Sequence, residues 1–455
     1  LVFKGTAHFS GQELARKVQE RGGHWNAYTS VNRTVYYIDG PAESWQIFLN
    51  LLTELVFFPT FPEDEMEREK EVVRREMAMY ADDPDSVAYQ LLMQTLYLKH
   101  PRRWPVLGER AAFDCLTRQD VLDYHASRYV PNNVVLSIAG DVDAAEILSH
   151  LELLVEDLKS RPLNREPIPH EPHQFGSRRV RKEFAVPYSK LHLAWRLPCS
   201  AHPDTPALSA LSSILGGGRS ARFYEKFHDR LGLVYSIEVH SNQSETDEGA
   251  FTISMDVDRA QRDKVRDLVL QELRNLAEGD FTEDLKRVCK QTRVSRLRRR
   301  SSASGVASEM GADWFGSRNL NLSSEWQEAI ERVTTEDLHR VCSTWLSSPN
   351  VTEVSLDPPG SNAGDEERAS ASAGTALSEH VLGNGMKVVI REDHRLPLAY
   401  ACMAFKAGCR AENEHDAGVT DLMSECLLKG TSTRSAADIA RFLEDIGGAI
   451  NTSTG

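Results

Sequence analysis

The chain has 455 residues, of which 41% are hydrophobic and 26% charged, as in globular proteins with room for two or three domain-sized cores. The formal net charge of −14 argues against nucleic-acid binding as the main task, and no apolar run approaches the roughly 18 residues of a membrane span. Seven scattered cysteines without a C-x-x-C pair predict free or buried thiols, not a zinc cage or a disulfide framework.

Helix-like and strand-like stretches alternate through the first 160 residues. Ser10-Gly-Gln-Glu13 has the form of a capping box, and it predicts a helix that stops at Gly22-Gly23. Residues 24–38 are rich in β-branched and aromatic side chains and predict two strands around a turn near Val31-Asn32. Further on, the pattern predicts an apolar helix over 44–57, a charged helix over 63–80, and a strand, turn and helix over 132–158.

The same alternation returns after a proline-rich joint at 161–174. It predicts a strand at 190–198, a helix at 208–218 stopped by glycines, strands at 232–241 and 249–257, and helices at 261–278 and 282–300. Residues 357–376 are rich in Pro, Gly, Ser and charge, which is typical of a linker.

These patterns predict an α+β fold. We expect two homologous α/β modules, each an antiparallel sheet flanked by helices, that together form one half of a larger unit. The expected boundaries are 1–165 and 175–356 for the modules, 357–377 for a flexible linker, and 378–455 for the start of a second, repeated half.

The last thirty residues repeat the first thirty. Residues 1–30 and 426–455 align without a gap and share ten identities, where average residue usage would give about two. The second copy has a lead-in over 380–425 that the first copy lacks, so we expect the chain to be a fragment. Any targeting segment would also lie ahead of Leu1, so the compartment stays open, with a lean toward the bacterial periplasm.

The predicted helix over 63–80 carries two carboxylates that could do chemistry. At helical spacing, Glu69 and Glu76 share a face with Val72, Val73 and Tyr80, and we expect this face to pack inward. Buried carboxylates are costly unless they are paired or bind a metal. In the bland alternative, both lie at the rim of the module and pair with arginines of the same helix, which are Arg68, Arg74 and Arg75.

Several short segments resemble the pitrilysin/insulinase family of zinc peptidases, the inverzincins, which include mitochondrial processing peptidase. The segments are KGT at 4–6, GG-x-x-NAYTS at 22–30, the run EREKEVVRREMAMYADDPD at 67–85, LGGGRS at 215–220, RLGLVYSI at 230–237 and GNGMKVV at 383–389. No one of them is decisive, but their order and spacing together cover almost the whole chain.

The resemblance implies a zinc metalloendopeptidase that cuts extended polypeptides or peptides with a metal-activated water. The family's H-x-x-E-H would end immediately before Leu1 and would supply two zinc ligands and the general base, so this fragment alone should be inactive. Glu76 matches the third Zn²⁺ ligand in context and spacing, and Glu69 matches a carboxylate that supports the site.

The resemblance also implies a substrate-binding strand. His24–Ser30 would be an edge strand that pairs with an extended substrate through Asn26, Ala27, Tyr28 and Thr29. The bland alternative is an ordinary structural strand.

A competing interpretation is a non-catalytic homologue that acts as a structural or substrate-presenting subunit, within a homo- or hetero-oligomer. In the second copy, the five residues that correspond to H-x-x-E-H are Asp421-Leu-Met-Ser-Glu425. This set cannot replace two imidazoles and a base, so we expect the second half to be non-catalytic. The sequence leaves the natural substrate and the cleavage specificity open.

Overall fold

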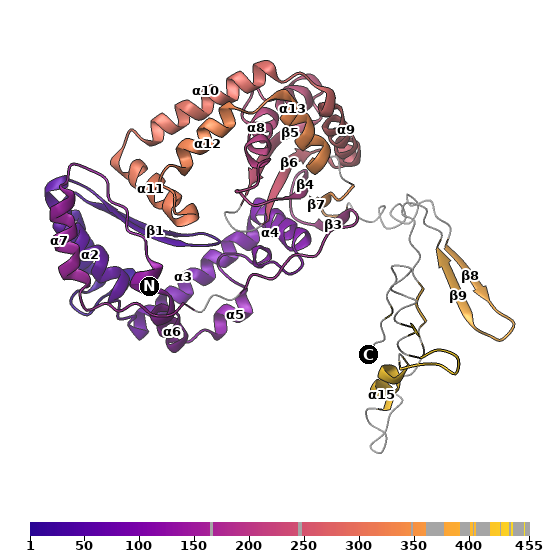
Figure 1. Cartoon of the computed structure of the whole chain (residues 1–455), viewed down its shortest axis with the longest axis horizontal. Helices are drawn as coiled ribbons and strands as arrows, with labels where there is room; N and C mark the ends of the chain where they lie inside the picture. Colours follow the sequence, from indigo (N-terminus) through magenta and orange to yellow (C-terminus); the bar gives the residue numbers. More distant parts are fainter. Residues whose placement is uncertain are drawn as a thin grey trace. The chain divides into compact units, whose positions relative to one another are not determined.

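The structure is a computed structural model that describes residues 1–163, 167–243, 248–346, 349–360 and 377–391, together with 401–403, 405, 419–427, 429–435, 438–439 and 450. The chain divides into two compact units, Leu1–Arg368 and Ala369–Gly455 (Figure 1). The division falls inside the range expected for the linker. Asp357, the first residue of that range, is instead the last residue of a buried strand.

The first module begins with the predicted helix and hairpin. Helix α1 (Gly11–Gln19) starts with the capping box, in which Ser10 Oγ accepts from Glu13 N at 3.3 Å and Glu13 Oε2 accepts from Ser10 N at 2.8 Å. Gly22 follows with φ +68°, a conformation that favours glycine. Strands β1 (His24–Thr29) and β2 (Thr34–Asp39) then form an antiparallel pair.

Helices make up most of the rest of the first module. They are α2 (Trp45–Phe57), α3 (Glu63–Asp82), α4 (Pro84–Leu96), α5 (Arg110–Cys115), α6 (Arg118–Arg128) and α7 (Ala144–Val155). The core joins α1, α2 and the chain start through Val2, Leu14, Val18, Leu51, Leu55 and Phe61. The predicted strand near 132–139 is wrong, since residues 134–139 belong to no sheet in the described part of the chain. A strand is defined by its ladder, and no described residue forms a ladder with this segment.

The second module is built on a five-stranded sheet with the order β3-β7-β4-β6-β5. Its strands are β3 (Arg178–Glu183), β4 (Ser189–Leu197), β5 (Val234–Asn242), β6 (Gly249–Val257) and β7 (Thr352–Asp357). All neighbours are antiparallel except β3 and β7, which are parallel. The α+β prediction is confirmed, although the second sheet is mixed where we expected an antiparallel one.

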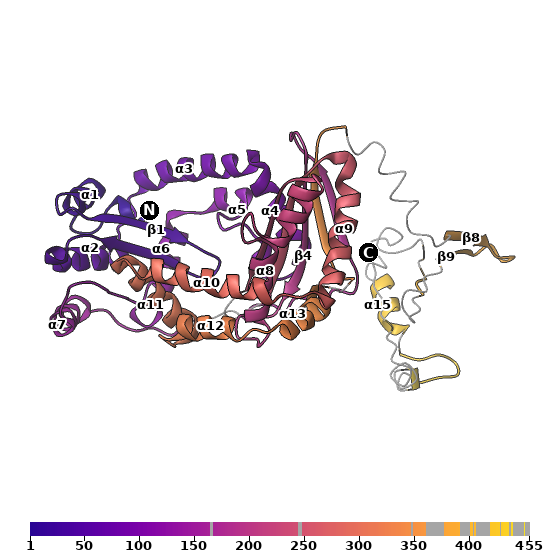
Figure 2. The same cartoon turned by 90° about the horizontal axis from the view of Figure 1, so that it is seen from above.

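The helices of the second module cover one face of this sheet. They are α8 (Thr205–Gly216), α9 (Arg262–Asn275), α10 (Thr282–Arg299), α12 (Leu322–Glu331) and α13 (Thr335–Val341), whereas α11 (Ala303–Ser317) lies away from the sheet (Figure 2). Along β4, Leu191, Leu193 and Trp195 point into this helical core, whereas Lys190 and Ala194 lie on the opposite face. As predicted, α8 ends at glycines, of which Gly218 has φ +113°.

The opposite face of the sheet is covered by a helix of the first module. Leu92, Leu96 and Tyr97 of the α4 region pack against Ala194 and Val354 of the sheet. The carboxylate of Glu171 accepts three backbone N–H bonds at the end of α4, from Leu98, Lys99 and His100 at 2.6, 2.8 and 2.9 Å. Helix α4 is therefore part of both modules.

Two further polar contacts hold the sheet and the modules together. Arg262 and Asp357, both completely buried, form an ion pair between α9 and β7, and Ser189 Oγ also donates to Asp357 at 2.5 Å. At the far end of the unit, Ser137 Oγ donates to Ala307 O of α11 at 2.8 Å, so α11 also contacts the first module.

In the unit Ala369–Gly455 the structure describes an antiparallel hairpin, β8 (Leu377–Val381) and β9 (Lys387–Arg391), and a helix, α15 (Val419–Cys426). The repeat keeps its local geometry. Gly430 bridges to Ser435 as Gly5 does to Ser10, and Ser435 Oγ donates to the carboxylate of Asp438 at 2.7 Å. The six cysteines within the described residues are free, as predicted, and none of the helices described has both the length and the apolar character to cross a membrane.

We expect Glu171→Gln to lower the free energy of unfolding by about 2 kcal/mol, because all three N–H groups lose a charged acceptor and the amide keeps only one oxygen that can accept. Burial raises the pKa of Glu171, but the three N–H bonds lower it further, to a net value below the ordinary 4.5. The stabilisation is therefore complete above pH 4.5 and is lost as the pH falls through the folded value. As the pH falls below 4.5, the free energy of unfolding measured in urea should decrease more for the wild type than for Glu171→Gln. Equal stability of the two proteins at pH 7, with exposed Glu152→Gln as control, would contradict this role.

Candidate active site

Helix α3 carries both predicted carboxylates, but its environment differs from our expectation. Glu69 and Glu76 are half-buried and lie two turns apart. The predicted inward packing of their face is wrong, because Val72 is 51% exposed and Tyr80 46% exposed. Met66 is the one buried residue of this helix, so α3 is not held by an apolar stripe.

Cationic side chains hold α3 instead. Lys70 Nζ donates to Leu116 O at 2.9 Å, and Arg74 Nε donates to Asp114 Oδ1 at 2.8 Å. Arg118 of α6 donates to the carbonyl of Phe61 at 2.6 Å, just before α3 begins. Phe61 itself has φ +46°, a conformation that is uncommon for a bulky residue, and its side chain is buried in the core of the first module. These contacts set the position of α3 from the α5–α6 side.

Glu69 and Glu76 differ in their partners. Lys4 Nζ lies 2.5 Å from Glu69 Oε1, so Glu69 pairs with the lysine of the KGT segment and not with an arginine of its own helix. Glu76 has neither a hydrogen bond nor an ion pair to any residue that the structure describes.

The residues present do not form a zinc site on their own. Within the described parts of the chain, no group of three His, Cys, Asp or Glu side chains is placed to hold a metal ion. Glu76 offers one unpaired carboxylate, which fits one Zn²⁺ ligand. Glu69 is already paired with Lys4 and fits a supporting position.

Strand β1 has one edge that no described strand covers. Ser30 N donates to Arg33 O at 2.8 Å across the turn. Because hydrogen-bonded pairs alternate along an antiparallel ladder, Tyr28 and Asn26 then point their main-chain groups toward β2, whereas Thr29 and Ala27 point theirs to the open edge.

The side chain of Asn26 covers part of this edge. Its Oδ1 accepts from Ala27 N at 2.8 Å, at an exposed position. We expected both Asn26 and Ala27 to bind substrate through their main-chain groups. At the open edge only the main-chain groups of Ala27 face outward, and Asn26 is present there through its side-chain amide.

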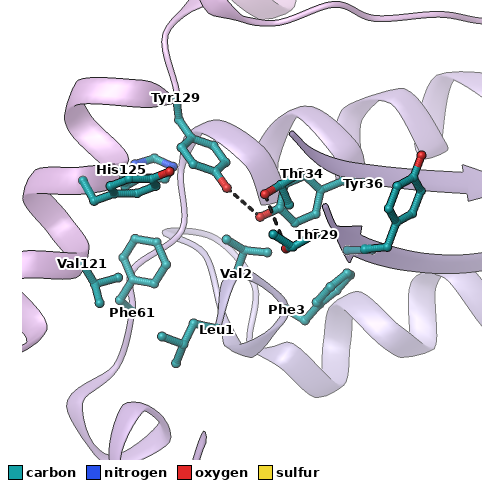
Figure 3. A pocket seen from close by; sticks show the side chains of 13 residues that line it. Leu1, Val2, Phe3, Thr29, Thr34, Tyr36, Phe61, Val121, His125 and Tyr129 are labelled. Carbon is teal, nitrogen blue, oxygen red and sulfur yellow. Dashed lines mark hydrogen bonds between the residues drawn. The ribbon is translucent and has the colours of Figure 1, made fainter. Parts of the chain in front are cut away.

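A pocket of about 310 Å³ lies next to this strand (Figure 3). Its walls come from the chain start, the β1–β2 hairpin, Phe61 and α6 with the residue that follows it. The lining residues are Leu1, Val2, Phe3, Ala27, Tyr28, Thr29, Thr34, Tyr36, Phe61, Val121, Tyr124, His125 and Tyr129.

Neutral groups provide the polar contacts of the pocket. The hydroxyls of Tyr36 and Tyr129 lie 2.8 Å apart, and burial followed by this hydrogen bond raises the pKa of Tyr36 above its ordinary range. Burial lowers the pKa of His125, and the bond between its Nε2 and Val56 O offsets this only in part. At neutral pH the pocket wall is therefore aromatic and uncharged.

Two family models match the chain. The one described as Insulinase (Peptidase family M16) matches residues 1–110 and 387–455, and the one described as Peptidase M16 inactive domain matches residues 116–291. The chain belongs to peptidase family M16, the pitrilysin/insulinase family. The first model matches twice, on both sides of the linker, in agreement with the internal repeat.

Curated relatives and solved structures agree with this assignment. An uncharacterized zinc protease of Rickettsia felis is 26% identical over 360 residues, which cover 76% of this chain and 84% of the relative. Zinc protease PqqE of Helicobacter pylori is 26% identical over 367 residues, which cover 79% and 82%. The crystal structure of a protease from Helicobacter pylori superposes with a TM-score of 0.71 at 26% identity, over 79% of this chain and 88% of that one.

The family resemblance expected from the sequence is confirmed, whereas the roles of Glu69, Glu76 and residues 26–29 stay predictions. Sequence reasoning missed Lys4 as the partner of Glu69, although KGT was recognised. It also missed the contact of Tyr36 with Tyr129, because no periodic pattern links residues 93 positions apart.

We expect the 455-residue chain by itself not to retain zinc. One unpaired carboxylate cannot hold the ion against dilution, since protein zinc sites use three or four ligands. Elemental analysis after dialysis against zinc-free buffer should find well under one zinc per chain. Stoichiometric zinc that survives dialysis and is lost in Glu76→Gln would contradict this expectation, because it would reveal further ligands in the chain.

Proposed function

We propose that the protein is a zinc-dependent metalloendopeptidase that cuts extended polypeptides or peptides. The observation that carries this proposal is Glu76, a half-buried carboxylate with no partner in the described structure, two helical turns from Glu69. A half-buried carboxylate without a partner is costly, and binding a cation would compensate the cost. The family membership and the relatives called zinc proteases support Zn²⁺ as that cation.

The proposed zinc site needs ligands beyond those that the structure describes. We propose that an H-x-x-E-H ends directly ahead of Leu1, where the family resemblance of residues 4–6 and 67–85 would put it. Bound zinc would supply a Lewis acid and a water of lowered pKa. In this proposal Glu76 binds the metal, and Lys4 fixes the orientation of Glu69.

We propose that the substrate adds as a strand along the open edge of β1. A flexible polypeptide needs a main-chain template, and Ala27 and Thr29 point their N–H and C=O groups to this edge. Substrate would have to displace the side chain of Asn26 from Ala27 N. The aromatic pocket of Figure 3 lies next to the same residues, in a position to take a side chain of the bound strand.

A second candidate is a non-catalytic member of the family that presents substrate or stabilises a partner subunit. Two observations favour it: residues 116–291 match the inactive-domain model, and no three-ligand group exists in the described residues. The five residues ahead of Leu1 and a peptide hydrolysis assay distinguish the two candidates. An intact H-x-x-E-H with chelator-sensitive cleavage supports the peptidase.

In the protein extended by the segment ahead of Leu1, Glu76→Gln should reduce zinc content severalfold, because a neutral amide is a far poorer ligand than a carboxylate. Glu69→Gln should lower kcat with a smaller loss of metal. Exposed Glu67→Gln on the same helix is the matched control and should change neither quantity. Equal zinc content in the wild type and Glu76→Gln, measured by elemental analysis, would refute the ligand assignment.

Ala27→Pro should raise KM at least tenfold while leaving zinc bound, because proline removes the main-chain donor at the open edge. Ala27→Ser keeps that donor and serves as the control. Steady-state kinetics with a peptide substrate give the answer once circular dichroism shows that both variants are folded. Wild-type cleavage by a folded Ala27→Pro protein means that substrate does not pair with β1.

A further inference from the structure

The C-terminal end of α11 exposes parts of several large apolar side chains. Trp314 and Phe315 in its last turn are 37% and 39% exposed, and Leu320 just after it is 53% exposed. The same helix buries polar side chains on its other side, where Asp313 accepts from Ser323 N and Oγ at 3.0 and 2.7 Å. The orientation of α11 is therefore fixed by buried polar bonds, and its aromatic end is held at the surface.

Cationic groups lie over these aromatic rings. The guanidinium of Arg318 is 5.8 Å from the ring centre of Trp314, and that of Arg33 is 5.4 Å from the ring centre of Phe315. Arg318 has no carboxylate partner within the described residues, in a chain whose formal net charge is −14. This surface is thus apolar with positively charged arginines at its rim, whereas the chain as a whole carries a net negative charge.

This surface continues the open edge of β1. Arg33 belongs to the turn that ends the strand, and Val31 at the tip of that turn is 63% exposed. Both views show α11 beside the β1–β2 hairpin (Figures 1 and 2), and the bond from Ser137 to Ala307 ties α11 to the first module. Through Arg33, Phe315 therefore lies next to the turn at which β1 ends.

We propose that the α11 surface, formed by Trp314, Phe315, Arg318, Leu320, Val31 and Arg33, is a second binding site for the polypeptide substrate. It takes an aromatic or large aliphatic side chain with an acidic residue beside it. From Ala27 to Val31 is four residues, or about 13 Å at about 3.3 Å per residue. The preferred pair therefore lies about four residues from the substrate residue that faces Ala27.

The chemistry of the surface sets this preference. Exposed Trp and Phe side chains lose little rotamer freedom when they bind an apolar side chain, and such aromatic anchors dominate binding energies. Arg318 gives an acidic neighbour a charge-assisted partner. The proposal rests on the proposed pairing of substrate with β1, but it does not require bound zinc.

The test measures peptide binding to the 455-residue chain by fluorescence anisotropy. Labelled peptides share a central Val-Thr-Val and carry Phe-Glu, Phe-Lys or Ser-Lys four residues before or after it. The wild type should bind the Phe-Glu peptide about tenfold more tightly than the Ser-Lys peptide in one of the two placements. Phe315→Ala should remove this preference, and Arg318→Glu should reverse the preference for Glu over Lys.

The matched control is Trp104→Ala, which removes another exposed aromatic ring with an arginine, Arg103, 4.8 Å from its centre. It should keep the full preference. Thermal unfolding checks that each variant is folded. Because Arg318→Glu keeps the aromatic rings, it tests the surface even if Phe315→Ala unfolds.

The outcomes separate this inference from the proposed function. Equal affinity of the wild type for all peptides, or an unchanged preference in Phe315→Ala, overturns the α11 surface. If Ala27→Pro still weakens binding of every peptide in that case, the pairing with β1 stands alone. If Ala27→Pro changes no affinity, the continuous path from β1 to α11 is wrong. Loss of the zinc assignment through Glu76→Gln leaves these binding results unaffected.

Discussion

Helix α4 packs against the sheet of the second module, and the geometry of the candidate site depends on this contact. Only Asp83 lies between the end of α3 and the start of α4. Its carboxylate caps α4 by accepting a hydrogen bond from Ser86 N at 2.9 Å. At its other end, the carboxylate of Glu171 accepts three N–H bonds, of which the one from His100 is buried. Since α3 carries the two carboxylates, their position relative to the second module follows from this one helix.

The first module holds α3 by charge instead of apolar burial. Lys70 and Arg74 bind the α5–α6 side, Arg118 of α6 binds the carbonyl of Phe61 ahead of α3, and Lys4 binds Glu69. Exposed ion pairs contribute little to stability, so this arrangement is better suited to orienting a helix than to stabilising it. Apolar side chains such as Val72 and Tyr80 remain exposed on α3 within the described structure.

The sequence predicted local features well and distant contacts poorly. The capping box, the hairpin over 24–38 and the glycine stop of α8 follow from residues close in the chain, and the structure confirms them. The strand expected at 134–139 and the inward face of α3 fail, because both depend on which neighbours lie alongside. For the site, the resemblance singled out Glu69 and Glu76, but no pattern could show that Lys4 pairs with one while the other lacks a partner. The parallel pairing of β3 with β7 could not be predicted either, because Arg178 and Thr352 are 174 positions apart in the chain.

The repeat of the capping box has a consequence for how the two copies fold. Ser435 and Asp438 form the same cap as Ser10 and Glu13, and the Gly–Ser bridge ahead of it is kept as well. The positions that would carry chemistry in the second copy hold Asp421 and Glu425 instead of histidines. The two copies therefore share the residues that start the helix. A cap of four residues sets where the helix begins in each copy, so this local folding signal does not depend on the chemistry of the residues that precede it.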